Sequence, residues 1–274
     1  MLGFGTHAIH NHRAVFYNRH EVFKNLGFDT FTSVEYMSDV DKTPKNWAKD
    51  NVLTGAIMDS LKSTEGRDYV HTISVQGHGK YPPEQLIQNP NINITAAPNE
   101  ELKWKYEYYV NQIYEMDKFV RDLTSELEKF NEPTVVVMFG DHIPALDITE
   151  ETYALKDLYK TQYVIWSNFK MEKIDQKLKA YELSSVLFER LGIHTGNIIQ
   201  YGQNVDRNNP EYLKGLETLA YDVLYGKKYM YGEKSILYPT DMKMGVKPIK
   251  IKNIVQAGDK YYIKGENFTE YSKV

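Results

Sequence analysis

Short apolar runs alternate with longer stretches of helical spacing along this chain. The strand-like runs cover residues 3–9, 69–75, 134–139 and 163–166, and the helical patterns cover 16–26, 50–61, 101–130, 182–191 and 210–225. This alternation is typical of an α/β fold built on a mainly parallel sheet. Residues 28–48 carry neither pattern, and we expect a loop-rich excursion there.

The most strand-like run extends from Thr134 to Phe139 and follows directly after Pro133. It shows no polar alternation, which predicts a central strand that is covered on both faces. A long amphipathic helix over 101–130 precedes it. One stripe of that helix carries Tyr109, Ile113, Met116, Val120, Leu123 and Leu127.

The pattern changes beyond residue 234. Ile249 to Lys252 alternates with period two, and Tyr261 to Gly265 resembles a strand that meets a turn. We therefore expect one domain over 1–233 and the start of a small β module over 234–274. The tail reaches Val274 without a closing strand, which suggests a fragment of a longer protein.

The composition of the chain argues against several kinds of binding partner and site. The 274 residues are 42% hydrophobic and 26% charged, as in a soluble globular protein. The 33 Lys and Arg against 37 Asp and Glu give a net charge of −4, so no basic field favours nucleic acid or an anionic membrane. The absence of cysteine excludes disulfides, thiolate zinc sites and a cysteine nucleophile.

Candidate metal chemistry follows the strand 134–139, where Gly140 leads into Asp141 and His142. Ligands bind beyond the carboxyl ends of strands in open α/β sheets, and a carboxylate with an imidazole suits Mn²⁺, Zn²⁺ or Fe²⁺. The alternative is that Asp141 caps a turn and His142 only packs. Two ligands fall short of a stable site in either case.

Two further segments carry candidate phosphate chemistry. His78 lies between Gly77 and Gly79 at a predicted strand end, where its imidazole could donate to a phosphoryl or alkoxide oxygen. Arg19 follows His10 and lies near a helix start, where a guanidinium fork could bind phosphate. An ordinary loop histidine and a solvated helix arginine are the alternatives.

The order of these motifs resembles that of the extracellular catalytic domain of the lipoteichoic acid synthase family. These are phosphoglycerol transferases of the alkaline phosphatase and sulfatase superfamily. The resemblance runs from about Gly3 to Tyr225, and the motifs that carry it are His10, Phe16-Tyr17-Asn18-Arg19, His78-x-x-Tyr81-Pro82 and Phe139-Gly140-Asp141-His142. It implies an alkaline-phosphatase-like three-layer sandwich that lacks its N-terminal half.

The resemblance also implies roles for single residues. Asp141 and His142 match the pair that binds one Mn²⁺ or Mg²⁺ ion. His78 matches the catalytic histidine that contacts glycerol phosphate, Arg19 matches the arginine that grips the phosphate, and His10 matches a further active-site histidine. Tyr17 occupies a substrate-binding position at which the family usually carries tryptophan, which leaves the lipid or polymer substrate open.

The reaction implied for the whole protein is the transfer of phosphoglycerol from phosphatidylglycerol to a cell-envelope glycan or polymer. It takes place at the extracellular face of a bacterial cytoplasmic membrane. The resemblance places the threonine nucleophile, an acidic metal ligand and the membrane helices before Met1, so we expect this chain alone to be inactive and its metal site incomplete. A sulfatase or phosphodiesterase and a non-catalytic glycerol-phosphate-binding domain are the alternatives.

Overall fold

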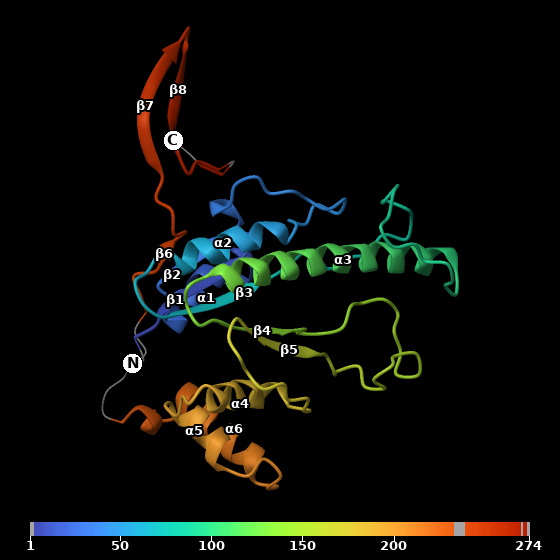
Figure 1. Cartoon of the computed structure of the whole chain (residues 1–274), viewed down its shortest axis with the longest axis vertical. Helices are drawn as coiled ribbons and strands as arrows, with labels where there is room; N and C mark the ends of the chain where they lie inside the picture. The colour runs from blue at the N-terminus through green and yellow to red at the C-terminus, as the bar shows by residue number, and fades with distance from the viewer. Residues whose placement is uncertain (1–2, 233–238, 270, 273–274) are drawn as a thin grey trace. The chain divides into compact units, whose positions relative to one another are not determined.

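The computed structural model describes residues 3–232, 239–269 and 271–272. The chain divides into two compact units, residues 1–170 with 239–274 and residues 171–238, and each is described by itself (Figure 1). The predicted domain boundary after residue 233 lies outside the described residues and stays a prediction.

The larger unit contains a four-stranded sheet in the order β3-β1-β2-β6. Its strands are β1 (Gly5–His10), β2 (Thr30–Ser33), β3 (Asp68–Ile73) and β6 (Lys243–Met244). Every pairing is parallel, with His7 opposite Thr30 on β2 and opposite Val70 on β3. The expectation of an α/β fold with a mainly parallel sheet is therefore confirmed.

Strand β2 corrects one expectation, because it lies inside the stretch 28–48 that was expected to be a loop. It consists of four residues, Thr30 to Ser33, and so few residues give almost no periodicity to detect. Phe31 is fully buried, and β2 lies between β1 and β6. Burial and pairing on both edges make this short segment a strand.

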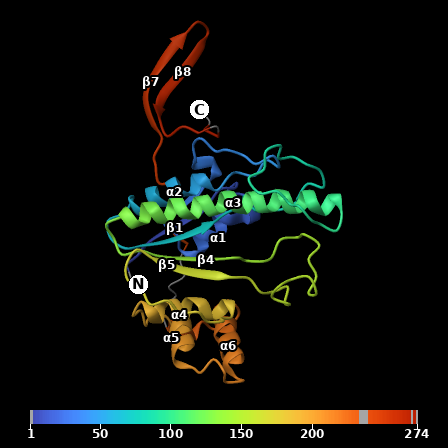
Figure 2. The same cartoon turned by 45° about the vertical axis from the view of Figure 1, so that its right-hand side comes forward.

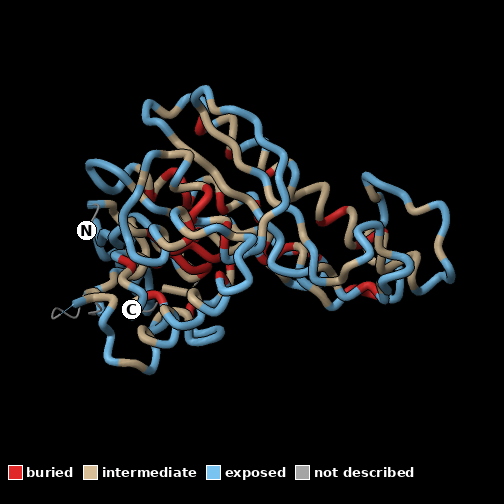
Figure 3. The backbone as a smooth tube through the Cα atoms, turned by 90° about the horizontal axis from the view of Figure 1, so that it is seen from below, coloured by how far each residue is buried: buried red, intermediate tan, exposed pale blue. Residues whose placement is uncertain are grey.

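Helices cover both faces of the parallel sheet. On one face, α2 (Asn51–Leu61) and α3 (Glu100–Lys129) pack over Ile9 of β1 in a cluster that includes Leu53, Phe119, Leu123 and Leu127. On the other face, Phe23 of α1 (Arg19–Leu26) packs with Ala8, Phe28 and Phe31. Ala8 and Ile9 are neighbours on one strand, so their side chains point to opposite layers. Figure 3 shows the buried residues gathered around this sheet.

The apolar run after Pro133 forms a strand, but it is not a central one. Strand β4 (Val135–Phe139) pairs antiparallel with β5 (Tyr163–Ser167) in a two-stranded sheet that is separate from the parallel one. Val136 and Trp166 pack against the cluster beneath α2 and α3, whereas Phe139 is 60% exposed. Within the described residues, α3 and its cluster cover one face of β4, so the prediction of burial on both faces is wrong. No described strand pairs with the second edge of β4, so the prediction of a central strand is wrong as well.

The smaller unit is helical, with α4 (Leu183–Arg190), α5 (Asn197–Asn204) and α6 (Tyr212–Leu224). Helices α4 and α6 match the predicted patterns, whereas α5 was not predicted. Gly202 of α5 lies against Ser185 of α4, where a Cβ atom would collide with the serine hydroxyl. Tyr212 is buried and packs on Tyr201, with 5.3 Å between the ring centroids.

The C-terminal segment forms a β-hairpin, which confirms the predicted short β segment. Strand β7 (Lys250–Ala257) pairs antiparallel with β8 (Lys260–Glu266), so the two strands close on each other (Figures 1 and 2). Each residue of β7 is exposed, including Ile251 and Ile254. Among the helices that the structure describes, none has the length and apolar character needed to cross a bilayer.

Candidate functional site

A cluster of rings lies where the parallel strands β1 and β3 end. His10 ends β1, and its ring centroid lies 5.8 Å from that of His12. The ring of His12 lies 4.6 Å from Phe16 and 5.5 Å from Trp47. Trp47 in turn contacts His78, which follows β3, at 5.0 Å. The fold thus brings the predicted residues His10 and His78 to one edge of the sheet, as expected for an open α/β sheet.

Arg19 joins this cluster at the N-terminus of α1. Its guanidinium carbon lies 5.6 Å from the Phe16 ring and 5.3 Å from the Tyr17 ring. Its Nη1 atom is buried and has no hydrogen-bond partner within the described residues. Burial lowers the pKa of Arg19, yet an arginine remains charged at neutral pH. The result is a fixed cation with an unused donor, as an anion site requires.

The backbone before α1 is unusual and explains how Tyr17 and Arg19 are presented. Tyr17 and Asn18 both have positive φ values, 53° and 55°. This left-handed region costs a side-chain-bearing residue free energy, and such strain gathers at functional sites. The double turn leaves the Tyr17 side chain 76% exposed while Arg19 begins the helix beneath it.

His10 is held as a neutral imidazole. Its Nδ1 atom lies 2.8 Å from the carbonyl oxygen of Ile73, which can only accept, so Nδ1 carries the proton. The pKa of His10 is lowered to about 4, chiefly by burial; the hydrogen bond to Ile73 opposes this shift, and the nearby charges of Arg19, His12 and His71 add to it. The Nε2 atom therefore carries a lone pair at neutral pH. Burial and Arg19 also lower the pKa of His12, whose Nδ1 is buried without a partner in the described structure.

His78 is oriented by its own loop. Its Nδ1 atom lies 2.7 Å from the carbonyl oxygen of Gly79, and its backbone N–H donates to Val75 at 3.0 Å. The Tyr81 hydroxyl donates to the Gly77 carbonyl at 3.0 Å, and burial, with the neighbouring Tyr109 and Tyr108, raises the pKa of Tyr81 to about 12. Tyr81 therefore stays protonated as the donor that fixes this loop.

Asp141 and His142 lie side by side in an exposed loop after β4. Their side chains are 81% and 70% exposed, and the His142 Nε2 atom lies 3.6 Å from Asp141 Oδ2. They follow β4, so their predicted place at the end of a central parallel strand is wrong. No group of three or more His, Cys, Asp or Glu side chains that could hold a metal occurs within the described residues. The residues described do not fit a complete metal site, and no chemical step is assigned to a metal here.

Three residues of this region were not predicted as functional. His12 and Trp47 form the middle of the ring cluster, and Asp50 is the residue at which the helical pattern over 50–61 begins. Asp50 does precede α2, but its side chain makes no capping bond. The alternation His10-Asn11-His12 at a strand end was the one signal that could have pointed to His12. Trp47 lies in the stretch that was expected to be a loop, and its contacts depend on tertiary structure.

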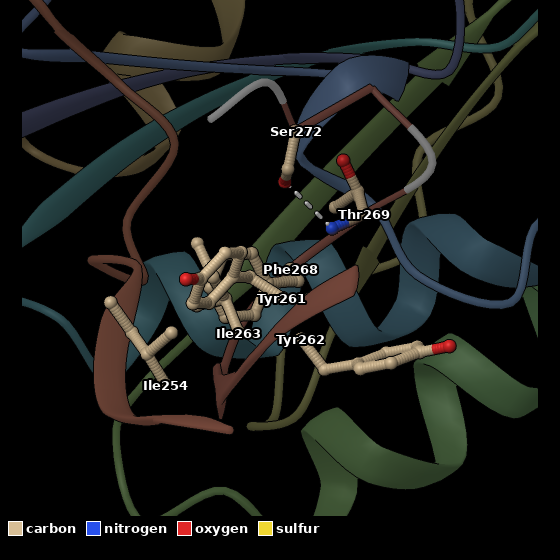
Figure 4. Close-up of a pocket in the computed structure, with 7 residues that line it drawn as sticks. All are labelled: Ile254, Tyr261, Tyr262, Ile263, Phe268, Thr269 and Ser272. Carbon is tan, nitrogen blue, oxygen red and sulfur yellow. Dashed lines mark hydrogen bonds between the residues drawn. The ribbon is translucent and has the colours of Figure 1, made fainter. Parts of the chain in front are cut away.

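A cavity of about 690 Å³ lies elsewhere, between the β7–β8 hairpin and Phe268, Thr269 and Ser272 (Figure 4). Its lining residues are Ile254, Tyr261, Tyr262, Ile263, Phe268, Thr269 and Ser272. The lining contains no carboxylate, imidazole or cation, and none of the predicted site residues belongs to it. The ring cluster around Arg19, rather than this cavity, carries the candidate chemistry.

Comparison with known proteins identifies the fold. The structure is similar to that of Streptococcus pyogenes phosphoglycerol transferase GacH in complex with sn-glycerol-1-phosphate. The TM-score is 0.68 and the identity 22%, over 87% of this chain and 66% of that chain. This likeness confirms an alkaline-phosphatase-like fold.

The chain is also similar in sequence to two curated proteins. The chain is 29% identical over 181 residues to a Rhizobium meliloti (strain 1021) protein named "Putative cyclic beta-1,2-glucan modification protein", covering 61% of this chain and 28% of that protein. It is 20% identical over 256 residues to the lipoteichoic acid synthase of Staphylococcus saprophyticus, covering 85% and 38%. The chain thus spans well under half the length of either relative.

A family description fits most of the chain. The family described as sulfatase matches residues 1–197, which include β1 to β5 and the whole ring cluster. This match agrees with the superfamily that the order of the motifs indicated. The chain therefore belongs to the sulfatase family.

Proposed function

We propose that the chain is part of a phosphoglycerol transferase and that the ring cluster around Arg19 binds the phosphate of a glycerol phosphate group. The observation that carries the proposal is that Arg19 Nη1 and His12 Nδ1 are both buried without a hydrogen-bond partner among the described residues, while both side chains contact Phe16. Both lie at the carboxyl edge of the parallel sheet, where such folds bind ligands. The similar GacH structure holds sn-glycerol-1-phosphate.

Each residue would then have a distinct task. Arg19 supplies the positive charge and a fork that matches two phosphate oxygens. His10 offers a neutral Nε2 that can accept a proton from an attacking hydroxyl, because its Nδ1 proton is bound to Ile73. His78, whose Nδ1 is bound to Gly79, can hold a phosphoryl oxygen or donate to a leaving alkoxide through Nε2. Tyr17 forms an exposed aromatic wall beside the anion.

The finer parts of the assignment belong to the same proposal. Asp141 and His142 would contribute to a Mn²⁺ or Mg²⁺ site only together with ligands from outside the described residues. The donor would be phosphatidylglycerol and the acceptor a cell-envelope glycan or polymer, at the extracellular face of the membrane. A sulfatase is the second candidate, because the family that matches is the sulfatase family and sulfate esters share the tetrahedral anion.

Calorimetric titration with sn-glycerol-1-phosphate and with inorganic sulfate tests the proposal. We expect glycerol phosphate to bind, and Arg19→Ala to weaken the affinity about 30-fold, since a charge-assisted bidentate contact contributes on the order of 2 kcal/mol. Arg13→Ala is the matched control, because Arg13 is exposed on the same loop. Equal and small effects of the two substitutions would contradict the site, and a preference for sulfate would favour the sulfatase.

A further inference from the structure

Asp50 is a fully buried carboxylate that bonds to two other segments of the chain. Its Oδ1 atom accepts from Asn11 Nδ2 at 2.8 Å. The same oxygen accepts from the backbone N–H groups of Val75 and Gln76, both at 3.3 Å. The Asp50 backbone N–H donates to Gln76 Oε1 at 2.8 Å. A side chain in the capping position of α2 would normally bond to its own helix, and this one bonds to the loops after β1 and β3 instead.

The network continues to α3. The side-chain amide of Gln76, itself 1% exposed, donates to Gln112 Oε1 at 3.0 Å and also to Glu115. Lys49, the residue before Asp50, pairs with Glu115 at 2.9 Å. The segment that carries Asp50 is therefore fixed to a helix of the core as well as to both loops.

Each segment that Asp50 holds also carries one ring of the site. Asn11 precedes His12, Val75 and Gln76 precede His78, and Trp47 lies three residues before Asp50. The Trp47 ring lies between the two imidazoles, 5.5 Å from His12 and 5.0 Å from His78. We infer that Asp50 is a positioning residue that fixes the spacing of His12, Trp47 and His78 without touching the ligand.

The hydrogen bonds that Asp50 accepts fit this task. Burial raises its pKa, while the hydrogen bonds from Asn11, Gln76 and Val75 oppose that rise. A buried acceptor with three donors is costly to remove, because the donors would lose their partner away from water. Asparagine at this position keeps an acceptor oxygen of the same shape, and alanine does not.

Ring-current shifts in NMR spectra provide a test that needs no ligand. The Trp47 indole displaces the ring-proton resonances of His12 and His78, which are assigned with the His12→Gln and His78→Gln variants. Trp47→Leu gives the reference without this displacement. In the folded full chain we expect Asp50→Ala to remove at least half of the displacement and Asp50→Asn to retain most of it.

A second variant keeps the test decisive if Asp50→Ala does not fold. Asn11→Ala removes one bond of the network, and we expect it to shift the His12 resonances and spare those of His78. Asn111→Ala is the matched control, because Asn111 is also buried and bonds Ile92 and Glu107. Unchanged ring positions in a folded Asp50→Ala, or equal shifts in Asn11→Ala and Asn111→Ala, would overturn the inference.

A binding measurement also tests the role of Asp50. It rests on the proposed function, whereas the ring-current measurement does not. With sn-glycerol-1-phosphate as the probe, we expect Asp50→Ala to weaken affinity at least tenfold and Asp50→Asn less than threefold. Absence of binding to the unsubstituted chain would refute the proposed function, while the ring-current comparison would still decide the role of Asp50. Unaltered affinity in Asp50→Ala, when the unsubstituted chain binds, would refute that role.

Discussion

The edge of the parallel sheet and the loop after β4 both carry histidines, yet they hold them in opposite ways. His10 is 2% exposed, and its Nδ1 proton is bound by Ile73 on the neighbouring strand β3. His142 is 70% exposed, and its Nδ1 atom lies 2.9 Å from the carbonyl oxygen of the next residue, Ile143. A bond across the sheet fixes an imidazole relative to other segments, whereas a bond to the next residue fixes it only within its loop. The first region thus fixes its histidine between two strands, and the second fixes the ring only within an exposed loop.

The largest expected effect is on the free energy of unfolding, when a buried side chain beneath α2 and α3 is compared with an exposed one on β4. Leu53→Ala removes a fully buried side chain beneath α2 and α3, and we expect a loss of about 3 kcal/mol in the free energy of unfolding. Phe139→Ala removes an exposed ring at the end of β4, and we expect less than about 1 kcal/mol. Urea unfolding of both variants measures the difference. Equal losses would show that β4 is as deeply packed as the parallel sheet.

The second effect concerns pH and His10. Its pKa is lowered to about 4 in the folded state from an ordinary value of 6.5. Between these values the unfolded state binds more protons, so the free energy of unfolding falls as the pH drops from 6.5 to 4. The loss from this group reaches at most roughly 3 kcal/mol. Urea unfolding at several pH values should show a steeper fall for the unsubstituted chain than for His10→Gln, and parallel curves would contradict the assignment.

A smaller effect is expected at the end of α1. Gly27 adopts a φ of 90° as the C-cap residue, where its N–H donates to Lys24 and Phe23. A Cβ atom there would meet nothing within 4 Å, so the cost of Gly27→Ala is conformational, about 1 kcal/mol. Thermal unfolding measures it. Gly55→Ala within α2 is the control, because Gly55 also has space and alanine favours the helix, so that variant should be neutral or stabilised.

The smallest effect is expected at the loop after β4. His142→Ala should change the affinity for sn-glycerol-1-phosphate less than threefold, because His142 is exposed and belongs to no cluster of metal-binding side chains in the described residues. Calorimetry with Mn²⁺ should detect weak binding or none, since two ligands do not complete a site. Tight Mn²⁺ binding that is lost in His142→Ala would show that the two regions form one site in this chain.

The sequence predicted those features that depend on long or regular patterns. The parallel α/β class, the helix over 100–129 and the C-terminal β segment follow from periodicity and are confirmed. The position of β4 does not, because an apolar run specifies burial but not a strand's neighbours. Strand β2 was too short to recognise.

The sequence likewise predicted some residues of the candidate site and missed others. His10, Arg19 and His78 lie in motifs that resemble those of a known family. The structure brings these residues to the carboxyl edge of the parallel sheet. Trp47 and Asp50 act through contacts between distant segments, such as Asp50 with Asn11, 39 residues apart. The sequence around Trp47 does not distinguish it from an ordinary loop residue, and the sequence around Asp50 does not distinguish it from an ordinary helix cap.

The turn that contains the two left-handed residues before α1 has a kinetic consequence. The backbone N–H groups of Phe16 and Asn18 donate to the carbonyl oxygens of Arg13 and Val15 at 3.1 and 3.0 Å, so the turn that presents Arg19 is closed by its own hydrogen bonds without an anion. Folding rather than binding then bears the entropy of ordering this turn. Association with a small phosphate should therefore be a single fast phase with no slow conformational step, and its rate should fall with ionic strength, because the attraction to Arg19 is electrostatic.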